Sequence, residues 1–166
     1  MTSLDAERKV AICADGGELP YDLFLGIPVH RAPEVVEQSG MCVDGWIPVD
    51  PFTLETSYPG VYAVGDVTSV GTPKAGVFAE GQAAVVAAAL IDRTRGTEPG
   101  ATYDGKGICY LEFGGDQVAK VEVAFVPGEM PNGKLQGPST LLAEDKEAFG
   151  TDRIRRWFDR DWSLTA

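Results

Sequence analysis

The sequence predicts a mixed α/β fold with an α+β C-terminal part, and three features support that prediction. In the run VYAVGDV, Val61 to Val64 is predicted to be a buried strand, and a glycine and an aspartate follow it. Ala75 to Asp92 is apolar almost all round, which is typical of a helix buried on several sides. Further on, two strand-like runs, Gly107 to Phe113 and Val118 to Val126, flank Gly114-Gly115-Asp116, which favours a tight hairpin turn.

The N-terminal residues predict a β-hairpin followed by a short helix. Lys9 to Ala14 and Tyr21 to Leu25 are the predicted strands, and Asp15-Gly16-Gly17 is the turn between them. We expect no strand before this hairpin. Ala32 to Ser39 is predicted to be a short helix, which Gly40 ends from the C-cap position.

The ends of the later helices are predicted from capping residues. Thr72 suits the N-cap of the long apolar helix, and Pro73 suits its first helical position. Pro127 to Pro138 is predicted to be a loop. Ser139 then caps a further helix, and a second helical turn is expected from Thr151 to Arg160.

Composition excludes several classes of function. The formal net charge of −11 argues against binding to nucleic acid and against adsorption to anionic lipid. No apolar run approaches the roughly 20 residues of a membrane-spanning helix, and the N-terminus lacks a signal-peptide pattern, so we expect a cytoplasmic protein. The cysteines Cys13, Cys42 and Cys109 are widely spaced and His30 is the one histidine, so neither a disulfide framework nor a metal site is expected.

The longest continuous pattern runs through the middle of the chain. GWIPVDPFTLETSYPG, Gly45 to Gly60, precedes VYAVGDV, and Thr72 to Leu90 follows it. This order resembles the second flavin-binding motif of the pyridine nucleotide-disulfide oxidoreductases. Within that superfamily, KGICYLEFGG (Lys106 to Gly115) and EAFGTDRIRRWF (Glu147 to Phe158) look most like the sulfide:quinone oxidoreductase branch.

The resemblance implies a fragment of a longer protein, because the GxGxxG motif that holds the FAD pyrophosphate is absent from the sequence. It implies partial FAD/NAD(P)-binding Rossmann-like segments followed by a small sheet with helices. Residues 1–30 would end the NAD-binding-type domain, 31–98 would be the C-terminal segment of the FAD-binding domain, and 99–166 would be a C-terminal quinone or interface domain.

The implied activity is FAD-dependent electron transfer from sulfide, or another donor, to a quinone. An NADH:quinone-type relative that uses NAD(P)H with the same flavin is one alternative. A non-catalytic module for dimerisation or binding is another. The isolated chain is expected to be inactive and, because half of an interface would be exposed, to form oligomers.

The resemblance assigns the flavin contacts to two short segments. Gly65 and Asp66 would meet the ribityl chain of FAD, and Lys74, Ala75 and Gly76 would lie beside the isoalloxazine. There the helix N-terminus and the lysine would stabilise the reduced, anionic flavin. Two alternatives stay open: Asp66 as the cap of a local turn, and Lys74 as a solvated surface residue.

Cys109 matches the position of the cysteine that works with cysteines from the N-terminal part of sulfide:quinone oxidoreductases to form a persulfide or polysulfide beside the flavin. Ile108 and Phe149 match residues that sandwich the quinone ring. Adjacent strand residues point to opposite faces, so Ile108 and Cys109 would serve two separate compartments. The alternatives are a buried cysteine that acts as a small hydrophobe and two ordinary core residues.

RIRRWFDRDW, Arg153 to Trp162, combines aromatic residues with arginines on an acidic chain. The resemblance implies a peripheral membrane contact through which quinone enters. The alternative is a charged helix that packs on its own domain through Ile154, Trp157 and Phe158.

Overall fold

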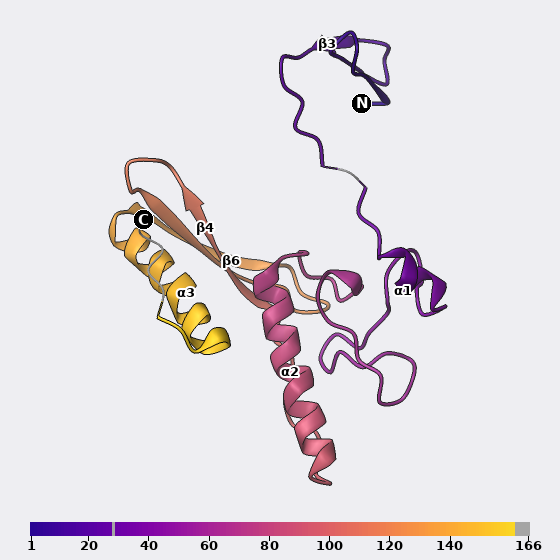
Figure 1. Ribbon diagram of the computed structural model, residues 1–166, viewed down its shortest axis with the longest axis vertical. Coiled ribbons are helices and arrows are strands. Elements are labelled where there is room, and N and C mark those ends of the chain that lie inside the picture. The colour runs from indigo at the N-terminus through magenta and orange to yellow at the C-terminus, as the bar shows by residue number, and fades with distance from the viewer. Residues whose placement is uncertain (28, 162–166) are drawn as a thin grey trace. The chain divides into compact units, whose positions relative to one another are not determined.

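The computed structural model describes residues 1–27 and 29–161, and the chain separates into two compact units, Met1–His30 and Arg31–Ala166. Two three-stranded antiparallel sheets and three α-helices make up the regular structure of the described residues (Figure 1). The predicted mixed α/β class is therefore confirmed. The first predicted boundary falls at the division between the two units, whereas the assignment of the three segments to domains stays a prediction.

The N-terminal unit is a small meander. Its strands β1 (Ser3–Asp5), β2 (Val10–Ile12) and β3 (Glu18–Pro20) pair in sequence order. The predicted turn is correct, since the N–H of Cys13 donates to the carbonyl of Gly17 at 2.8 Å. The predicted partner strand, Tyr21 to Leu25, was wrong. Because the turn is tight, pairing starts immediately after Gly17, at Glu18, and the N–H of Tyr21 makes the last bond of the ladder, to the carbonyl of Lys9 at 3.0 Å.

β1 was also missed, because we expected no strand before the hairpin. It pairs with β2 from Ser3 opposite Ile12 to Asp5 opposite Val10. Three residues are too few to show a period in the sequence. β1 therefore depends on pairing with β2 rather than on a local signal.

The second unit begins with α1 (Glu34–Gln38), which confirms the predicted short helix. Gly40 follows it with a φ of +76°, as a helix-ending glycine should. The chain then runs through loops that pair only at isolated bridges, including Ile47 with Thr68 and Glu55 with Tyr62.

The predicted strand Val61 to Val64 was wrong as a regular strand. Tyr62 makes one isolated bridge, and the N–H of Ala63 donates to the carbonyl of Leu54 at 3.1 Å. Ala63 and Leu54 are buried, whereas Val61 is exposed. The stretch thus crosses the core in an extended form, and a short 3-10 helix, η1 (Gly65–Val67), follows it directly.

The long helix α2 (Gly76–Thr94) starts later than its capping residues predicted. Ala75 is the N-cap, so Thr72 and Pro73 precede the helix. The physical reason is a competing bond, because the hydroxyl of Thr72 accepts a hydrogen bond from Nε2 of Gln82 at 3.3 Å instead of capping.

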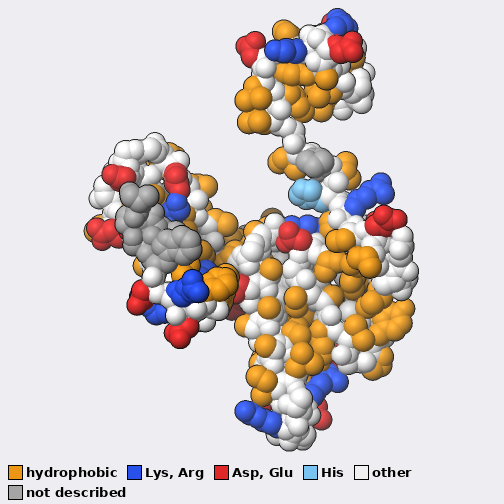
Figure 2. Space-filling view, in the orientation of Figure 1, with side chains coloured by type: hydrophobic (Ala, Val, Ile, Leu, Met, Phe, Trp, Pro, Cys, Tyr) orange, Lys and Arg blue, Asp and Glu red, His pale blue; other side chains and the backbone are white. Residues whose placement is uncertain are grey.

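The expectation that α2 is buried on several sides was wrong for its C-terminal half. Phe78, Gln82 and Ala89 are buried, but Leu90 and Ile91 are exposed. Hydrophobic side chains accordingly gather on the surface over α2 and the neighbouring loops (Figure 2). The helix buries one stripe and leaves the rest of its apolar surface open.

The C-terminal sheet consists of β4 (Lys106–Glu112), β5 (Val118–Ala124) and β6 (Asn132–Ser139), in that order. The first two strands and the Gly-Gly-Asp hairpin turn are confirmed. All three turn residues have positive φ, and the N–H of Phe113 donates to the carbonyl of Gln117 at 2.9 Å.

β6 lies where a loop was predicted, between residues 127 and 138. Its sequence NGKLQGPS is polar and contains glycine and proline, which are poor strand formers. It is an edge strand that pairs with β5, with Leu135 opposite Val121. Pairing with a neighbour overrides the local preference here.

The chain ends in one continuous helix, α3 (Leu141–Phe158), where a helix and a separate turn were predicted. Thr140 occupies the N-cap position, although the hydroxyl of Ser139 still accepts a hydrogen bond from the N–H of Leu142 at 3.4 Å.

α2 contacts an odd-numbered residue of β4, whereas α3 contacts an even-numbered one. Gly107 meets the ring of Phe78 on α2, whereas the ring of Tyr110 packs edge-on against Phe149 of α3, with 5.4 Å between centroids. Because side chains alternate along a strand, Gly107 and Tyr110 point to opposite faces of the sheet. The two helices therefore contact opposite faces of β4.

Candidate functional site

The turn that starts at Gly65 is fixed tightly against α2. Gly65 has a φ of +78°, and a side chain there would reach Cβ of Ala79 at 3.4 Å. Its N–H donates to Oε1 of Gln82 at 2.6 Å, and its carbonyl accepts hydrogen bonds from the N–H and the hydroxyl of Thr68. The buried side chains of Gln82 and Thr68 thus hold both polar groups of Gly65.

Asp66, the next residue, presents its side chain to solvent. Its carboxylate makes no hydrogen bond or ion pair within residues 1–27 and 29–161. The alternative role of Asp66 as a turn cap therefore has no counterpart in this structure. Both carboxylate oxygens are available to accept hydrogen bonds from a ligand hydroxyl.

The N-terminus of α2 lies beside this turn. No side chain caps it, and the carbonyl of Ala75 accepts hydrogen bonds from the N–H groups of Phe78 and Ala79. The N–H groups of Gly76 and Val77 have no partner among the residues described. With the helix dipole, these groups form a site that suits an electron-rich ligand edge.

Lys74 is directed toward the turn. Its Nζ donates to the carbonyl of Asp66 at 2.5 Å and to the carbonyl of Thr68 at 2.9 Å, and it lies 3.5 Å from the ring centroid of Trp46. Burial lowers the pKa of Lys74, and the nearby Asp66 opposes that shift. The lysine is therefore an internal tie rather than a freely solvated residue, and its contact with an isoalloxazine stays a prediction.

Cys109 lies on β4, on the same face as Gly107, and it is exposed. It therefore does not act as a buried hydrophobe in this structure. Gly107 is two residues away, and the ring of Phe78, in the first turn of α2, covers it. Two residues of a strand span about 7 Å, so Cys109 lies about that far along β4 from Gly107, where Phe78 of α2 makes its contact.

Ile108 and Phe149 share the opposite, α3-facing side of β4. Ile108 is half-buried and lines a groove of about 350 Å³ with Lys106, Glu122 and Ala124, which share its face of the sheet. The ring of Phe149 contacts Tyr110, the next residue on the face of Ile108. The two predicted quinone residues thus lie on one side of the strand, while Cys109 faces the other side.

Phe149 is also covered by a cation. The guanidinium carbon of Arg153 lies 3.4 Å from its ring centroid, and Nε of Arg153 donates to Oε2 of Glu80 on α2 at 2.8 Å. Arg156 pairs with the same glutamate. This cluster joins α3 directly to α2 and fixes the ring of Phe149 between Tyr110 and Arg153.

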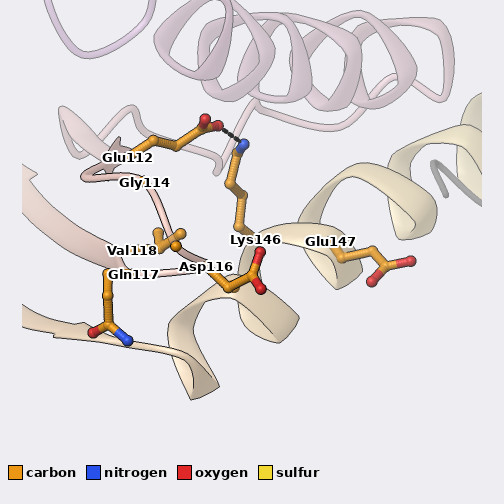
Figure 3. Close-up of a pocket in the computed structure, with 9 residues that line it drawn as sticks. Glu112, Gly114, Asp116, Gln117, Val118, Lys146 and Glu147 are labelled. Atoms are coloured by element: carbon orange, nitrogen blue, oxygen red, sulfur yellow. Dashed lines mark hydrogen bonds and ion pairs between the residues drawn. The ribbon is translucent and has the colours of Figure 1, made fainter.

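A larger pocket, of about 510 Å³, lies between the β4–β5 hairpin and α3 (Figure 3). Glu112 and Lys146 form an ion pair across it, and Asp116 and Glu147 also line it. None of the predicted site residues lines this pocket. Within the described residues there is no cluster of metal-ligating side chains, and no helix is long and apolar enough to cross a membrane.

Sequence reasoning missed Gln82, Thr68 and Trp46, which hold the turn and Lys74. The available signal was a lone glutamine in the apolar run GVFAEGQAAVVAAAL. A polar residue inside such a run requires a partner when it is buried.

The model of the pyridine nucleotide-disulphide oxidoreductase family matches residues 2–89, just over half of the 166-residue chain. The chain belongs to this family. A mitochondrial sulfide:quinone oxidoreductase of Mus musculus is 29% identical over 109 residues, which cover 64% of this chain and 24% of the mouse protein. The corresponding enzyme of Schizosaccharomyces pombe is 28% identical over 161 residues, 93% of this chain and 31% of that protein.

This chain thus spans about a quarter to a third of the length of these curated relatives. In a cryo-EM structure of the mitochondrial ATP synthase of Tetrahymena thermophila, one chain matches with a TM-score of 0.61. The match covers 73% of this chain and 31% of that chain at 23% identity, so it shows a shared fold alone.

Proposed function

We propose that this family member is the C-terminal part of an FAD-dependent oxidoreductase that passes electrons from sulfide through FAD to a quinone. The observation that carries the proposal is the division at β4. Cys109 is exposed on the α2-facing side, whereas Ile108 faces α3. The similarity to two sulfide:quinone oxidoreductases supports the same donor and acceptor.

The residues present fit FAD. The missing Cβ of Gly65 lets the turn lie close to Ala79 of α2, the exposed carboxylate of Asp66 suits ribityl hydroxyls, and the N–H groups of Gly76 and Val77 suit the electron-rich pyrimidine edge of a flavin. When bound, FAD supplies a two-electron acceptor. Ala75 and Lys74 complete this edge, with the lysine charge held close to the turn.

Cys109 would act as the sulfur nucleophile. Its thiolate sulfur forms an S–S bond with the sulfur of hydrosulfide, giving a persulfide. Formation of this bond releases the proton of hydrosulfide and two electrons, for which a bound FAD would be the acceptor. The exposure of the thiol supports this role, because a buried thiol would exclude hydrosulfide.

The acceptor would bind on the opposite side of β4. The groove beside Ile108 combines apolar and glycine residues with the polar side chains of Lys106, Glu122, Asn132 and Lys134, which suits an apolar ring that carries polar carbonyl groups. Two electrons and two protons then convert a quinone to a quinol. Phe149 contributes to this side through its contact with Tyr110.

A peripheral membrane contact through the end of α3 is part of the proposal. Trp157 and Phe158 are exposed, so the helix does not pack on its own domain through them. Aromatic side chains beside Arg155 and Arg156 suit a headgroup surface. Trp162, which the sequence also indicated, lies outside the described residues.

The test is anaerobic flavin bleaching of the intact protein, with sulfide added to one sample and NADH to another. We expect rapid bleaching by sulfide, loss of that bleaching in Cys109→Ser, and wild-type behaviour in Cys42→Ser, the matched control. The thiol of Cys42 is half-buried and donates to the carbonyl of Val36 at 3.7 Å, so it is already engaged.

Bleaching by NADH alone would reject the sulfide proposal and favour an NAD(P)H-dependent member of the family, in which Cys109 is passive. A protein isolated without flavin would reject both and favour a binding or dimerisation module.

A further inference from the structure

We propose that Gln82 is the positioning residue of the site: its buried amide fixes the Gly65–Asp66 turn to α2, so that the Asp66 carboxylate and the first amides of the helix meet one ligand together. The ligand part of this inference rests on the proposed function. The geometry of the turn does not depend on it.

The first argument is the burial of Gln82. Its side chain is 1% exposed, on a helix that is otherwise apolar along its buried stripe. Both ends of its amide are used, since Oε1 accepts from the N–H of Gly65 at 2.6 Å and Nε2 donates to the hydroxyl of Thr72 at 3.3 Å. A buried amide that is satisfied in this way favours one arrangement of the groups around it.

The second argument is that several residues hydrogen-bond to the turn, and among them Gln82 lies on α2. Lys74 holds the carbonyls of Asp66 and Thr68, and the N–H of Ile47 holds the carbonyl of Val67. Lys74 and Ile47 both belong to loops. The bond from Gln82 therefore sets the position of Gly65 relative to α2.

The third argument concerns the two halves of the site. The exposed carboxylate of Asp66 belongs to the turn, whereas the free N–H groups of Gly76 and Val77 belong to α2. A ligand that binds both halves loses affinity when they move independently, because it must then order them. Gln82 removes that freedom without touching the ligand.

The experiment compares Gln82→Met with Ala89→Gly in the intact protein. Methionine keeps the length and the helix preference of glutamine but cannot accept a strong hydrogen bond from the N–H of Gly65. Ala89 is buried on the same helix, so Ala89→Gly weakens α2 without touching the turn. The readout is amide hydrogen exchange at Gly65, with the neighbouring Ala63 amide, which donates to Leu54, as the internal reference.

We expect Gln82→Met to accelerate exchange at Gly65 by about tenfold, as for one lost buried hydrogen bond, while Ala63 exchanges as in the wild type. Ala89→Gly should change the exchange rates of the Gly65 and Ala63 amides by the same factor. Equal acceleration at Gly65 and Ala63 in Gln82→Met would overturn the inference and leave Gln82 as an ordinary core residue.

FAD titration of the same variants tests the ligand part. The dissociation constant should rise about tenfold in Gln82→Met and stay unchanged in Ala89→Gly. An unchanged constant in Gln82→Met, despite faster exchange at Gly65, would overturn the positioning role. If the wild-type protein binds no flavin, the proposed function fails, and the exchange comparison still decides whether Gln82 holds the turn.

Discussion

The contact between Gly107 and Phe78 joins β4 to α2, and Gly107→Ala tests it. An added Cβ at Gly107 would lie 2.5 Å from two carbons of the Phe78 ring, where ordinary contacts lie near 3.4 to 4 Å. The ring would have to retreat by about 1 Å to restore a normal contact. Phe78 is 2% exposed and packs edge-on against Phe125, with 5.7 Å between centroids, so it has no free space behind it.

We therefore expect Gly107→Ala to lower the free energy of unfolding by about 1–3 kcal/mol, the usual effect of overpacking a core. Urea denaturation of the intact protein, followed by tryptophan fluorescence, measures this change. Gly133→Ala is the matched control, since it lies on the same sheet face but its Cβ would meet its neighbours at 3.6 Å or more. The control should stay within about 0.5 kcal/mol of the wild type.

A double variant separates this clash from a general defect of β4. Phe78→Leu shortens the side chain, so adding Gly107→Ala to it should destabilise the protein less than Gly107→Ala does in the wild type, by at least about 1 kcal/mol. Strict additivity of the two changes would refute the reasoning. So would a Gly107→Ala protein as stable as the Gly133→Ala control.

Three further predictions concern side-chain contacts. Glu80→Gln removes the ion pairs to Arg153 and Arg156 and should lower the free energy of unfolding by about 1 kcal/mol, a difference that about 1 M salt reduces; Glu147→Gln, at an exposed position, is the control. Tyr103→Phe should leave stability within about 0.5 kcal/mol, because the buried hydroxyl makes no hydrogen bond in the described structure, whereas Tyr103→Ala should lose about 3 kcal/mol or more of packing; loss in both would show that the hydroxyl has a partner. Lys120 and Tyr110 lower the pKa of Asp145 below its ordinary value of 3.8, so the contribution of this carboxylate to stability is present above that value and is lost as the pH falls through the lowered pKa. The difference in free energy of unfolding between wild type and Asp145→Asn should therefore shrink between about pH 5 and pH 2, and a difference that does not change with pH would contradict the prediction.

The helices and the two long strands β4 and β5 could be predicted from local signals, while β1 and β6 depend on the strands they pair with. α2 is long and apolar, and the hairpin turn has residues suited to positive φ, so both were predicted near their observed places. β6 is polar and contains glycine and proline, and it forms because β5 offers an unpaired edge. No local pattern in the sequence records that edge.

The candidate site shows the same limit. The glycine and aspartate of the motif were found from the sequence, because the backbone conformation and the charge follow from the residue types. The direction in which the Lys74 side chain points could not be predicted from the sequence, since it depends on Trp46 and on the carbonyls of the turn. Thr72 likewise seemed free to cap α2 until its bond with Gln82 was seen.

The hairpin turn at the end of β4 has a consequence beyond its own loop. Its three positive-φ residues set the pairing that places Ile108 opposite Glu122 and Cys109 opposite Val121. A slip of one residue in this register would exchange the faces of every side chain on β4, so that the thiol would face α3 and the isoleucine would face α2. Insertion of a single residue near Gly115 is therefore a change at a distance that alters which side of the sheet each side chain faces, without any substitution at Ile108 or Cys109.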